Sequence, residues 1–146
     1  MIAAAFIIRC MKVCVHCSGA LKRQINTYCS NKCQMDYQYE TYIKAWKSHK
    51  TDGMRGLKVT SLSQHIVRYL REKYGNACSI CGWNTISRFT HKVPLEVDHI
   101  DGDARNNDES NLRLICPNCH SLTASYRNLN RGNGRNWRRE KYLRHT

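Results

Sequence analysis

Eight of the nine cysteines fall into four close pairs, and this spacing constrains the fold of the 146-residue chain more than any other feature. The pairs are Cys14/Cys17, Cys29/Cys33, Cys78/Cys81 and Cys116/Cys119. Such pairs, set at a distance from one another, are typical of metal ligands, whereas a disulfide framework is typical of small secreted chains. A chain of this length buries a limited core, so we expect metal staples to contribute to its stability.

Each set of four thiolates is predicted to bind one structural Zn²⁺ ion. The first site would use Cys14, Cys17, Cys29 and Cys33, which can close a tetrahedron within a short segment. His16 lies inside the first pair and could replace one cysteine, although an exposed bystander is the favoured interpretation. The second site would use Cys78, Cys81, Cys116 and Cys119 and would therefore tie the start of a folding unit to its end.

Apolar periodicity predicts a helix over residues 34–50 and a second one over residues 61–74. Ser61 and Gln64 have the spacing of a capping box at the start of the second helix. Residues 51–60 contain two glycines and are expected to form a linker.

The cysteine pairs of the second site enclose two predicted strands. Apolar and polar residues alternate over residues 93–97 and again over residues 112–116, and a run rich in turn formers separates the two. Leu122, Tyr126 and Leu129 then have helical spacing, which predicts a helix ending near Gly132. The expected order is strand, loop, strand, helix.

The charge distribution favours a polyanionic partner and also suggests a second kind of metal site. The chain has 24 Lys and Arg residues against 11 Asp and Glu residues, a formal net charge of +13. Six of the acids nevertheless lie within residues 96–109, where they would repel phosphate unless a cation neutralised them. A hard divalent cation prefers such oxygen ligands.

Three residues of this region have the chemistry needed for phosphodiester hydrolysis. His99 suits a general base, because imidazole titrates near neutral pH. Asp98 and His120 suit ligands of a catalytic divalent ion. Adjacent residues of a regular strand point to opposite faces, so we expect the strand to break up at residues 100–102 if Asp98 and His99 share a site.

The segment from Cys78 to Asn130 resembles the HNH endonuclease family, and the cysteine finger before it looks like those of phage-type homing endonucleases. The residues that carry the resemblance are Asp98, His99, Asn111, Leu112 and the run from Cys116 to Thr123. It implies a small α+β fold: a zinc-stapled ββα-metal, treble-clef-like core with an N-terminal zinc knuckle and a helical linker.

The same resemblance implies a function. It implies a DNA endonuclease that uses Mg²⁺ or Mn²⁺ and leaves 5′-phosphate and 3′-hydroxyl ends, with Asn111 holding the His99 loop in shape. Many relatives carry a Lys where this chain has Leu122 and Thr123, which puts a Lys–phosphate contact in doubt. The rival interpretation is a non-catalytic, zinc-dependent DNA-binding protein with a relic of the site.

Double-stranded DNA is the expected partner, and the basic C-terminal region is expected to contact its phosphates rather than to be only a charged tail. The residues assigned to this contact are Arg127, Arg131, Arg135, Arg138 and Arg139.

We therefore expect a leader of uncertain origin at 1–10, a zinc finger and helix at 11–50, a linker at 51–60, a helix plus nuclease core at 61–131 and a basic tail at 132–146. The apolar run at residues 2–8 is too short to span a bilayer and has no basic residue before it. These features, with the phage-type resemblance, predict a phage-encoded protein that acts in the bacterial cytoplasm without a membrane partner.

Overall fold

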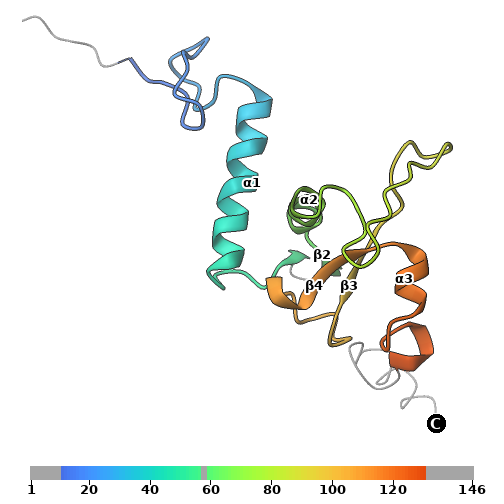
Figure 1. Ribbon diagram of the computed structural model, residues 1–146. Coiled ribbons are helices and arrows are strands. Elements are labelled where there is room, and N and C mark those ends of the chain that lie inside the picture. The colour runs from blue at the N-terminus through green and yellow to red at the C-terminus, as the bar shows by residue number, and fades with distance from the viewer. Residues whose placement is uncertain (1–10, 57–58, 131–146) are drawn as a thin grey trace, which may run out of the picture. The chain divides into compact units, whose positions relative to one another are not determined.

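The computed structural model describes residues 11–56 and 59–130 (Figure 1) and divides into two compact units, Met1–Tyr42 and Ile43–Thr146. The predicted leader and most of the predicted basic tail lie outside the described residues. In chain order the helices and strands are α1 (Asn31–Lys47), β1 (Met54–Gly56), β2 (Val59–Leu62), α2 (Gln64–Lys73), β3 (Glu96–His99), η1 (Glu109–Asn111), β4 (Leu112–Ile115), α3 (Pro117–Ser121) and η2 (Arg127–Asn130).

The first unit is a knuckle of tight turns followed by the start of α1. A single antiparallel bridge joins Val13 to Ala20, and the Cys14 amide donates to the Gly19 carbonyl at 2.9 Å. Ser30 precedes α1, and its hydroxyl accepts a hydrogen bond from the Cys33 amide at 3.2 Å, which satisfies one of the unpaired donors of the first turn. The last cysteine of the first set therefore lies at the beginning of a helix, as the sequence predicts.

The second unit is centred on an antiparallel pair of strands, β3 and β4. Their register pairs Asp98 with Arg113 and His99 with Leu112. α2 contacts β4, and α3 contacts β3. The residues that form the apolar core on β4 and α2 are almost fully buried: Ile66, Leu70, Leu112, Leu114 and Ile115.

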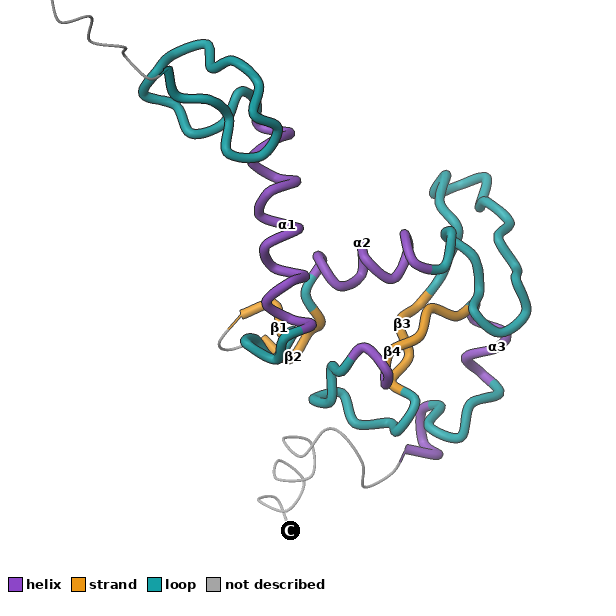
Figure 2. The backbone as a smooth tube through the Cα atoms, turned by 60° about the vertical axis from the view of Figure 1, so that its left-hand side comes forward, coloured by secondary structure: helices purple, strands orange, loops and turns teal. Residues whose placement is uncertain are grey.

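Residues 54–56 and 59–62 form two short paired strands, most of which lie in the segment expected to be a linker. β1 pairs antiparallel with β2, and Figure 2 shows this pair as a second small sheet, separate from β3 and β4. Ser63, not Ser61, caps α2, because its hydroxyl accepts from the His65 amide and Ser61 lies within β2. The Ser63 amide donates to the Gly53 carbonyl at 2.9 Å, so the residue that precedes β1 is hydrogen-bonded to the N-cap residue of α2.

The predicted helix from Cys119 to Gly132 is wrong, because α3 ends at Ser121. Leu122 is 85% exposed and Leu129 is 71% exposed, so the apolar stripe has no core to cover. The Thr123 hydroxyl donates to the His120 carbonyl at 2.9 Å and helps to end the helix.

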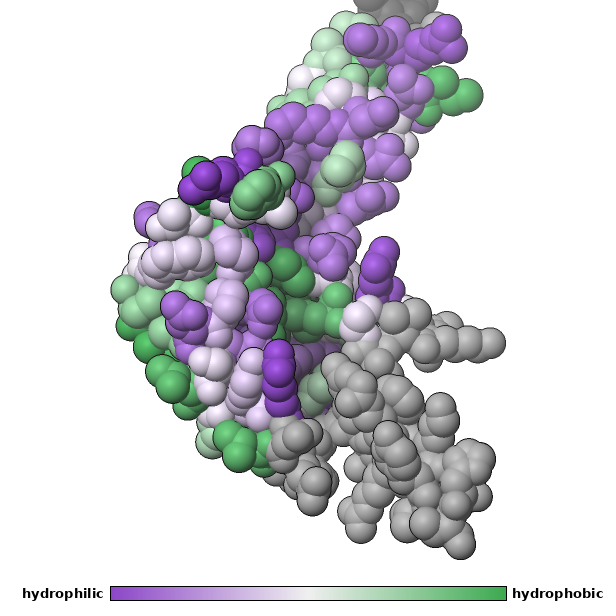
Figure 3. All heavy atoms as spheres, turned by 90° about the vertical axis from the view of Figure 1, so that its right-hand side faces the viewer, coloured by the Kyte–Doolittle hydropathy of each residue, from purple (hydrophilic) through white to green (hydrophobic). Residues whose placement is uncertain are grey.

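Polar and apolar side chains are interspersed on the surface of the second unit that Figure 3 presents. Within the part of the chain that the structure describes, no helix is both long and apolar enough to cross a membrane.

A cluster of charged and aromatic side chains joins the end of α1 to α2 and to η1. Glu109 accepts hydrogen bonds from the Tyr69 hydroxyl at 2.6 Å and from Lys73 at 2.8 Å, and Lys47 lies 3.2 Å from its second oxygen. Burial alone would raise the pKa of Glu109, but these hydrogen bonds lower it to about 2. The cluster anchors the turn that immediately precedes β4.

Replacing Glu109 by Gln should lower the free energy of unfolding by about 1–2 kcal/mol near neutral pH, because the charged acceptor of three donors is lost. The pKa of Glu109 is lowered on folding, so this stabilisation is fully present above pH 4.5 and is lost as the pH falls toward about 2. The difference between wild type and variant should stay constant between about pH 7 and pH 5. Chemical denaturation at several pH values measures it.

The control is Glu72→Gln, which breaks an exposed i,i+4 pair with Arg68. Its effect should be under about 1 kcal/mol. Equal effects of the two substitutions would contradict the importance of the Glu109 cluster.

Candidate active site

The second cysteine cluster has the geometry of a tetrahedral metal site. The sulfur atoms of Cys78, Cys81, Cys116 and Cys119 all lie within 4.8 Å of one another, and the Cys81 and Cys116 sulfurs are 3.9 Å apart. Tetrahedral Zn²⁺ with bonds of about 2.3 Å places its sulfurs about 3.8 Å apart, whereas a disulfide needs about 2.05 Å. The spacing fits a metal ion and excludes a disulfide in this arrangement.

The thiol pKa values in this cluster diverge, so the four cysteines need a bound cation to ionise together. Burial would raise the pKa of Cys78, but hydrogen bonds from the Cys81 and Cys116 amides lower it to about 6. Hydrogen bonding to Cys81 raises the pKa of Cys119 to about 12. Four adjacent thiols do not all ionise by themselves, and a bound dication supplies the charge that allows it.

The N-terminal cluster repeats this arrangement. Cys14, Cys17, Cys29 and Cys33 also have sulfurs within 4.8 Å of one another, with 3.6 Å between Cys17 and Cys29. The amide of Cys17 lowers the pKa of Cys14 to about 6. His16 does not replace a cysteine in this group, and its Nε2 lies 3.2 Å from a Glu40 carboxylate oxygen.

Asp98 and His120 are brought together from β3 and α3. Their nearest atoms, Asp98 Oδ1 and His120 Nε2, are 3.7 Å apart, and Asp98 is 4% exposed. Metal–oxygen and metal–nitrogen bonds of about 2.1 Å allow one ion to contact both atoms at this separation. The two side chains therefore fit a divalent cation as neighbouring ligands.

Two partners of this pair have no distinctive signal in the sequence. Glu96 contacts His120 Nδ1, which leaves Nε2 directed to Asp98. Arg113 donates to Asp98 Oδ2 at 2.8 Å, so the carboxylate keeps its other oxygen for an ion. Alternation along β3 places Glu96 beside Asp98 on one face, and the strand register places Arg113 opposite Asp98. Only the register, which local sequence does not determine, could have identified Arg113.

The acidic crowding between residues 96 and 109 is largely satisfied by the protein itself. Glu109 is held by lysines and Tyr69, and Asp103 accepts from the Arg105 amide at 2.9 Å. Burial works against the charged form of Asp101, but hydrogen bonds from Asn111 and the Asp103 amide lower the pKa of its carboxyl. Acidic crowding by itself therefore does not indicate a cation, and Asp98 and His120 are the residues that support one.

His99 is the last residue of β3, and its ring lies in a different environment from the Asp98 carboxylate. The strand remains paired through His99 and turns only at the following residue, so the expected break comes after the pair and not within it. His99 Nε2 lies 2.9 Å from Asn107 Oδ1. In the described part of the chain, no hydrogen bond or ion pair joins the ring of His99 to Asp98 or His120.

Asn111 braces the loop that follows His99. Its side-chain oxygen accepts from the Asp101 amide at 3.0 Å, and its amide group donates to the Asp101 carboxylate at 2.9 Å and to the Asn106 carbonyl at 2.8 Å. The Ile100 amide donates to the Asn111 carbonyl at 2.9 Å. Asn111 therefore contacts the loop backbone at three points, which suits the supporting role that the family resemblance implies.

Arg127 is the one predicted DNA contact among the described residues. It is exposed, and its guanidinium lies over the Tyr126 ring with 5.0 Å to the centroid. The Tyr126 ring contacts the His120 ring edge to face, at 5.4 Å between centroids. Arg127 therefore contacts a ring that itself contacts His120. The other four arginines, Arg131, Arg135, Arg138 and Arg139, lie outside the described residues.

Comparison with known proteins agrees with this geometry. Residues 78–124 match the family model described as HNH endonuclease. A stretch of 55 residues is 44% identical to H-N-H endonuclease F-TflIV of Escherichia phage T5, a match that covers 38% of this chain and 23% of that relative. No solved structure matches the chain significantly. The matched family region includes the second cysteine cluster, Asp98, His99, Asn111 and His120, so residues 78–124 of this chain form a domain of the HNH endonuclease family.

Proposed function

We propose that the protein is a metal-dependent DNA endonuclease that hydrolyses phosphodiester bonds. The observation that carries the proposal is the convergence of Asp98 Oδ1 and His120 Nε2 at 3.7 Å, with His99 as the next residue along the strand that carries Asp98. The proposed cofactors are two structural Zn²⁺ ions and one catalytic Mg²⁺ or Mn²⁺ ion. The proposed substrate is double-stranded DNA. The phage origin of the relative supports a phage-encoded protein, for which we propose a homing-type role in the bacterial cytoplasm.

Different residues of the chain would bind the metal ion, orient its ligands and accept the proton. Asp98 and His120 would hold the divalent ion, which when bound neutralises charge on the phosphate oxygens. Glu96 keeps the His120 ring oriented, and Arg113 keeps the Asp98 carboxylate in place. His99 accepts a proton from the attacking water, while the loop braced by Asn111 holds His99 at the end of the strand.

Loss of the His99 imidazole should reduce nicking of supercoiled plasmid DNA by about 100-fold or more, because a positioned general base contributes about that factor. The assay compares wild type with His99→Ala in Mg²⁺ or Mn²⁺. His91→Asn is the matched control, since His91 is an exposed loop residue with φ of 53° that Asn tolerates. Unchanged cleavage by His99→Ala would exclude His99 as the base, and no cleavage by wild type would favour a non-catalytic DNA-binding protein.

Cys78→Ser and Cys116→Ser should each lose one of the two zinc ions and unfold the second unit, because each removes a ligand that closes the cluster. Zinc content measured with a chromogenic chelator and the thermal unfolding curve report the two effects. Cys10→Ser is the control, since Cys10 belongs to none of the four cysteine pairs. Full zinc content and an unchanged melting temperature in Cys78→Ser would contradict the structural zinc.

Truncation after Asn130 should weaken DNA binding and flatten its dependence on salt. The deletion removes Arg131, Arg135, Arg138 and Arg139. Each lost phosphate contact should reduce the slope of log K against log salt by about 0.9. Fluorescence anisotropy with labelled duplex at several salt concentrations measures the slope, and an unaltered slope would exclude the tail as a phosphate contact.

A further inference from the structure

The His99 ring is held by a residue that is itself held from outside the matched nuclease region. Asn107 Nδ2 donates to the Asp52 carbonyl at 2.9 Å, which leaves Asn107 Oδ1 facing His99 Nε2 at 2.9 Å. A carbonyl accepts only from the NH₂ end of the amide, so this orientation of Asn107 is fixed. Because Oδ1 can only accept, Nε2 must carry the proton, and in the neutral ring the lone pair lies on Nδ1.

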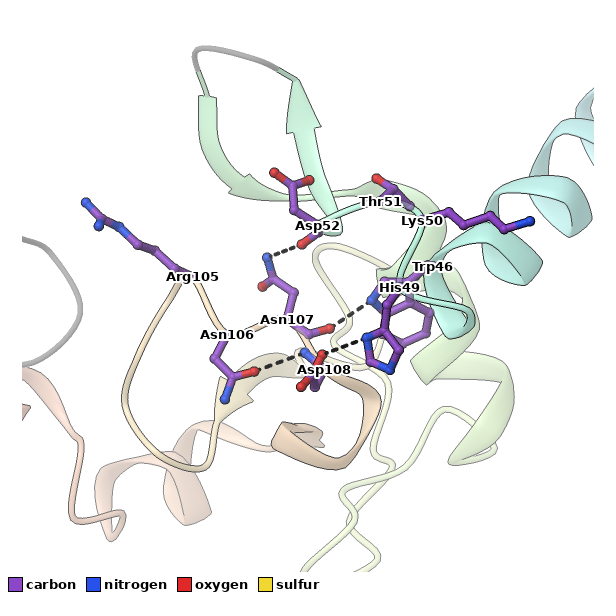
Figure 4. A pocket seen from close by; sticks show the side chains of 9 residues that line it. All are labelled: Trp46, His49, Lys50, Thr51, Asp52, Arg105, Asn106, Asn107 and Asp108. Atoms are coloured by element: carbon purple, nitrogen blue, oxygen red, sulfur yellow. Dashed lines mark hydrogen bonds and ion pairs between the residues drawn. The ribbon is translucent and has the colours of Figure 1, made fainter.

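Asn107 is rigidly fixed at its backbone as well. The Trp46 indole donates from Nε1 to the Asn107 carbonyl at 2.8 Å, and Asn107 is 5% exposed. Figure 4 shows the hydrogen bonds that Asn107 makes with Trp46 and with Asp52, beside a polar hollow of about 340 Å³ that is lined by Trp46 and by residues 49–52 and 105–108. A buried amide whose donor and acceptor are both engaged has little freedom to rotate.

Gly53 makes the close approach of these segments possible. Its φ is +77°, and a Cβ at this position would lie 2.8 Å from Ile66 Cδ1 and 2.9 Å from Asn107 Cβ. Either contact is shorter than real Cβ atoms tolerate. A side chain at residue 53 would therefore displace Asn107 or α2, in addition to the strain of the left-handed backbone.

We infer that Asn107 is a positioning residue that holds His99 as the Nε2-protonated tautomer, and that Trp46, Gly53 and the Asp52 carbonyl hold Asn107 in turn. These four residues are called the Asn107 clamp. The segment from residue 46 to 53 then belongs to the working nuclease site, although it precedes the HNH domain at 78–124. The effect on rate rests on the proposed function, whereas the tautomer does not.

The clamp determines which nitrogen of His99 acts. The Nδ1 lone pair accepts the proton from the attacking water, and the Nε2 proton stays on the ring in its hydrogen bond to Asn107 Oδ1. An amide oxygen does not take up that proton at neutral pH, so Asn107 orients the ring and does not relay charge.

The tautomer can be read directly by NMR of zinc-loaded protein labelled with ¹⁵N-histidine, at about pH 8 where an ordinary imidazole is neutral. The His99 signals are assigned by their loss in His99→Gln. We expect the Nε2–H pattern in wild type and a mixture of tautomers in Asn107→Ala. An Nδ1–H pattern in wild type, or the same pattern in both proteins, would overturn the inference, and inactivity on DNA would not affect this result.

Steady-state cleavage separates positioning from general loosening of the loop. Asn107→Ala should lower kcat by about 10–100-fold with little change in KM, as loss of a residue that orients a reactive group does. Asn107→Asp keeps an acceptor for His99 Nε2 but loses the Nδ2 donor to the Asp52 carbonyl, so it should recover part of that loss. An aspartate variant as slow as the alanine variant would overturn the role of the acceptor.

The matched control is the neighbouring Asn106. Its side chain donates to Asp101 at 2.7 Å and accepts from the Asp108 amide at 3.3 Å, and these contacts do not involve His99. Asn106→Ala should change kcat by less than about threefold despite losing two hydrogen bonds. Equal losses of kcat in Asn106→Ala and Asn107→Ala would show that loop loosening explains both, and the clamp would be rejected.

Two further variants keep the test decisive if Asn107→Ala folds poorly. Trp46→Phe keeps an aromatic ring but removes the Nε1 donor to the Asn107 carbonyl. Gly53→Ala introduces a Cβ that would clash with Asn107 and Ile66. Each should reduce kcat while the zinc content stays at the wild-type level, because neither residue belongs to a cysteine cluster. Wild-type kcat in both folded variants would overturn the clamp.

Discussion

The cluster formed by Cys78, Cys81, Cys116 and Cys119 is the constraint on which the rest of the second unit depends. Cys116 follows β4 directly and is the N-cap residue of α3, where its sulfur accepts from the Cys119 amide at 3.4 Å. The cluster thus fixes where α3 begins and which way its first turn faces. His120 directly follows Cys119, so the four sulfurs also set the position of its imidazole. The core is small, so a zinc ion bound by this cluster would supply stability that a longer helix would otherwise provide by packing.

β3 gives the site two faces. Asp98 points to the side where His120 and Glu96 meet, and His99, the next residue, contacts the loop through Asn107. The regular pairing of Asp98 with Arg113 keeps these directions apart, which is how adjacent residues take different duties without a break in the strand. The other acids of residues 96–109 do not form a non-specific cation-binding site, since most of them accept hydrogen bonds or form ion pairs within the protein. One carboxylate oxygen beside one imidazole selects a metal ion by ligand type and geometry, which a cluster of carboxylates does less well.

The sequence carries the elements whose chemistry is local. Cysteine spacing predicts both clusters, and the Asp98–His99 pair with the CxxC–His run points to Asp98 and His120 as the proposed ligands, because these signals need no knowledge of tertiary contacts. The features that the sequence does not predict depend on contacts between residues that are far apart in the chain. Arg113 is identified by strand register, Glu96 by the facing helix, and Asn107 by contacts with residues more than 50 positions earlier. The apolar stripe at Leu122 and Leu129 fails as a helix signal because no core lies opposite it.

A crystal grown with Mn²⁺ in place of the proposed catalytic metal would locate the ion through the anomalous difference map at the manganese edge. We expect one Mn²⁺ peak within bonding distance of both Asp98 Oδ1 and His120 Nε2, about 2.1–2.2 Å from each. The peak should disappear in Asp98→Asn crystals of unchanged fold. A Mn²⁺ peak in the 101–109 loop instead, or none beside His120, would contradict a catalytic ion shared by β3 and α3.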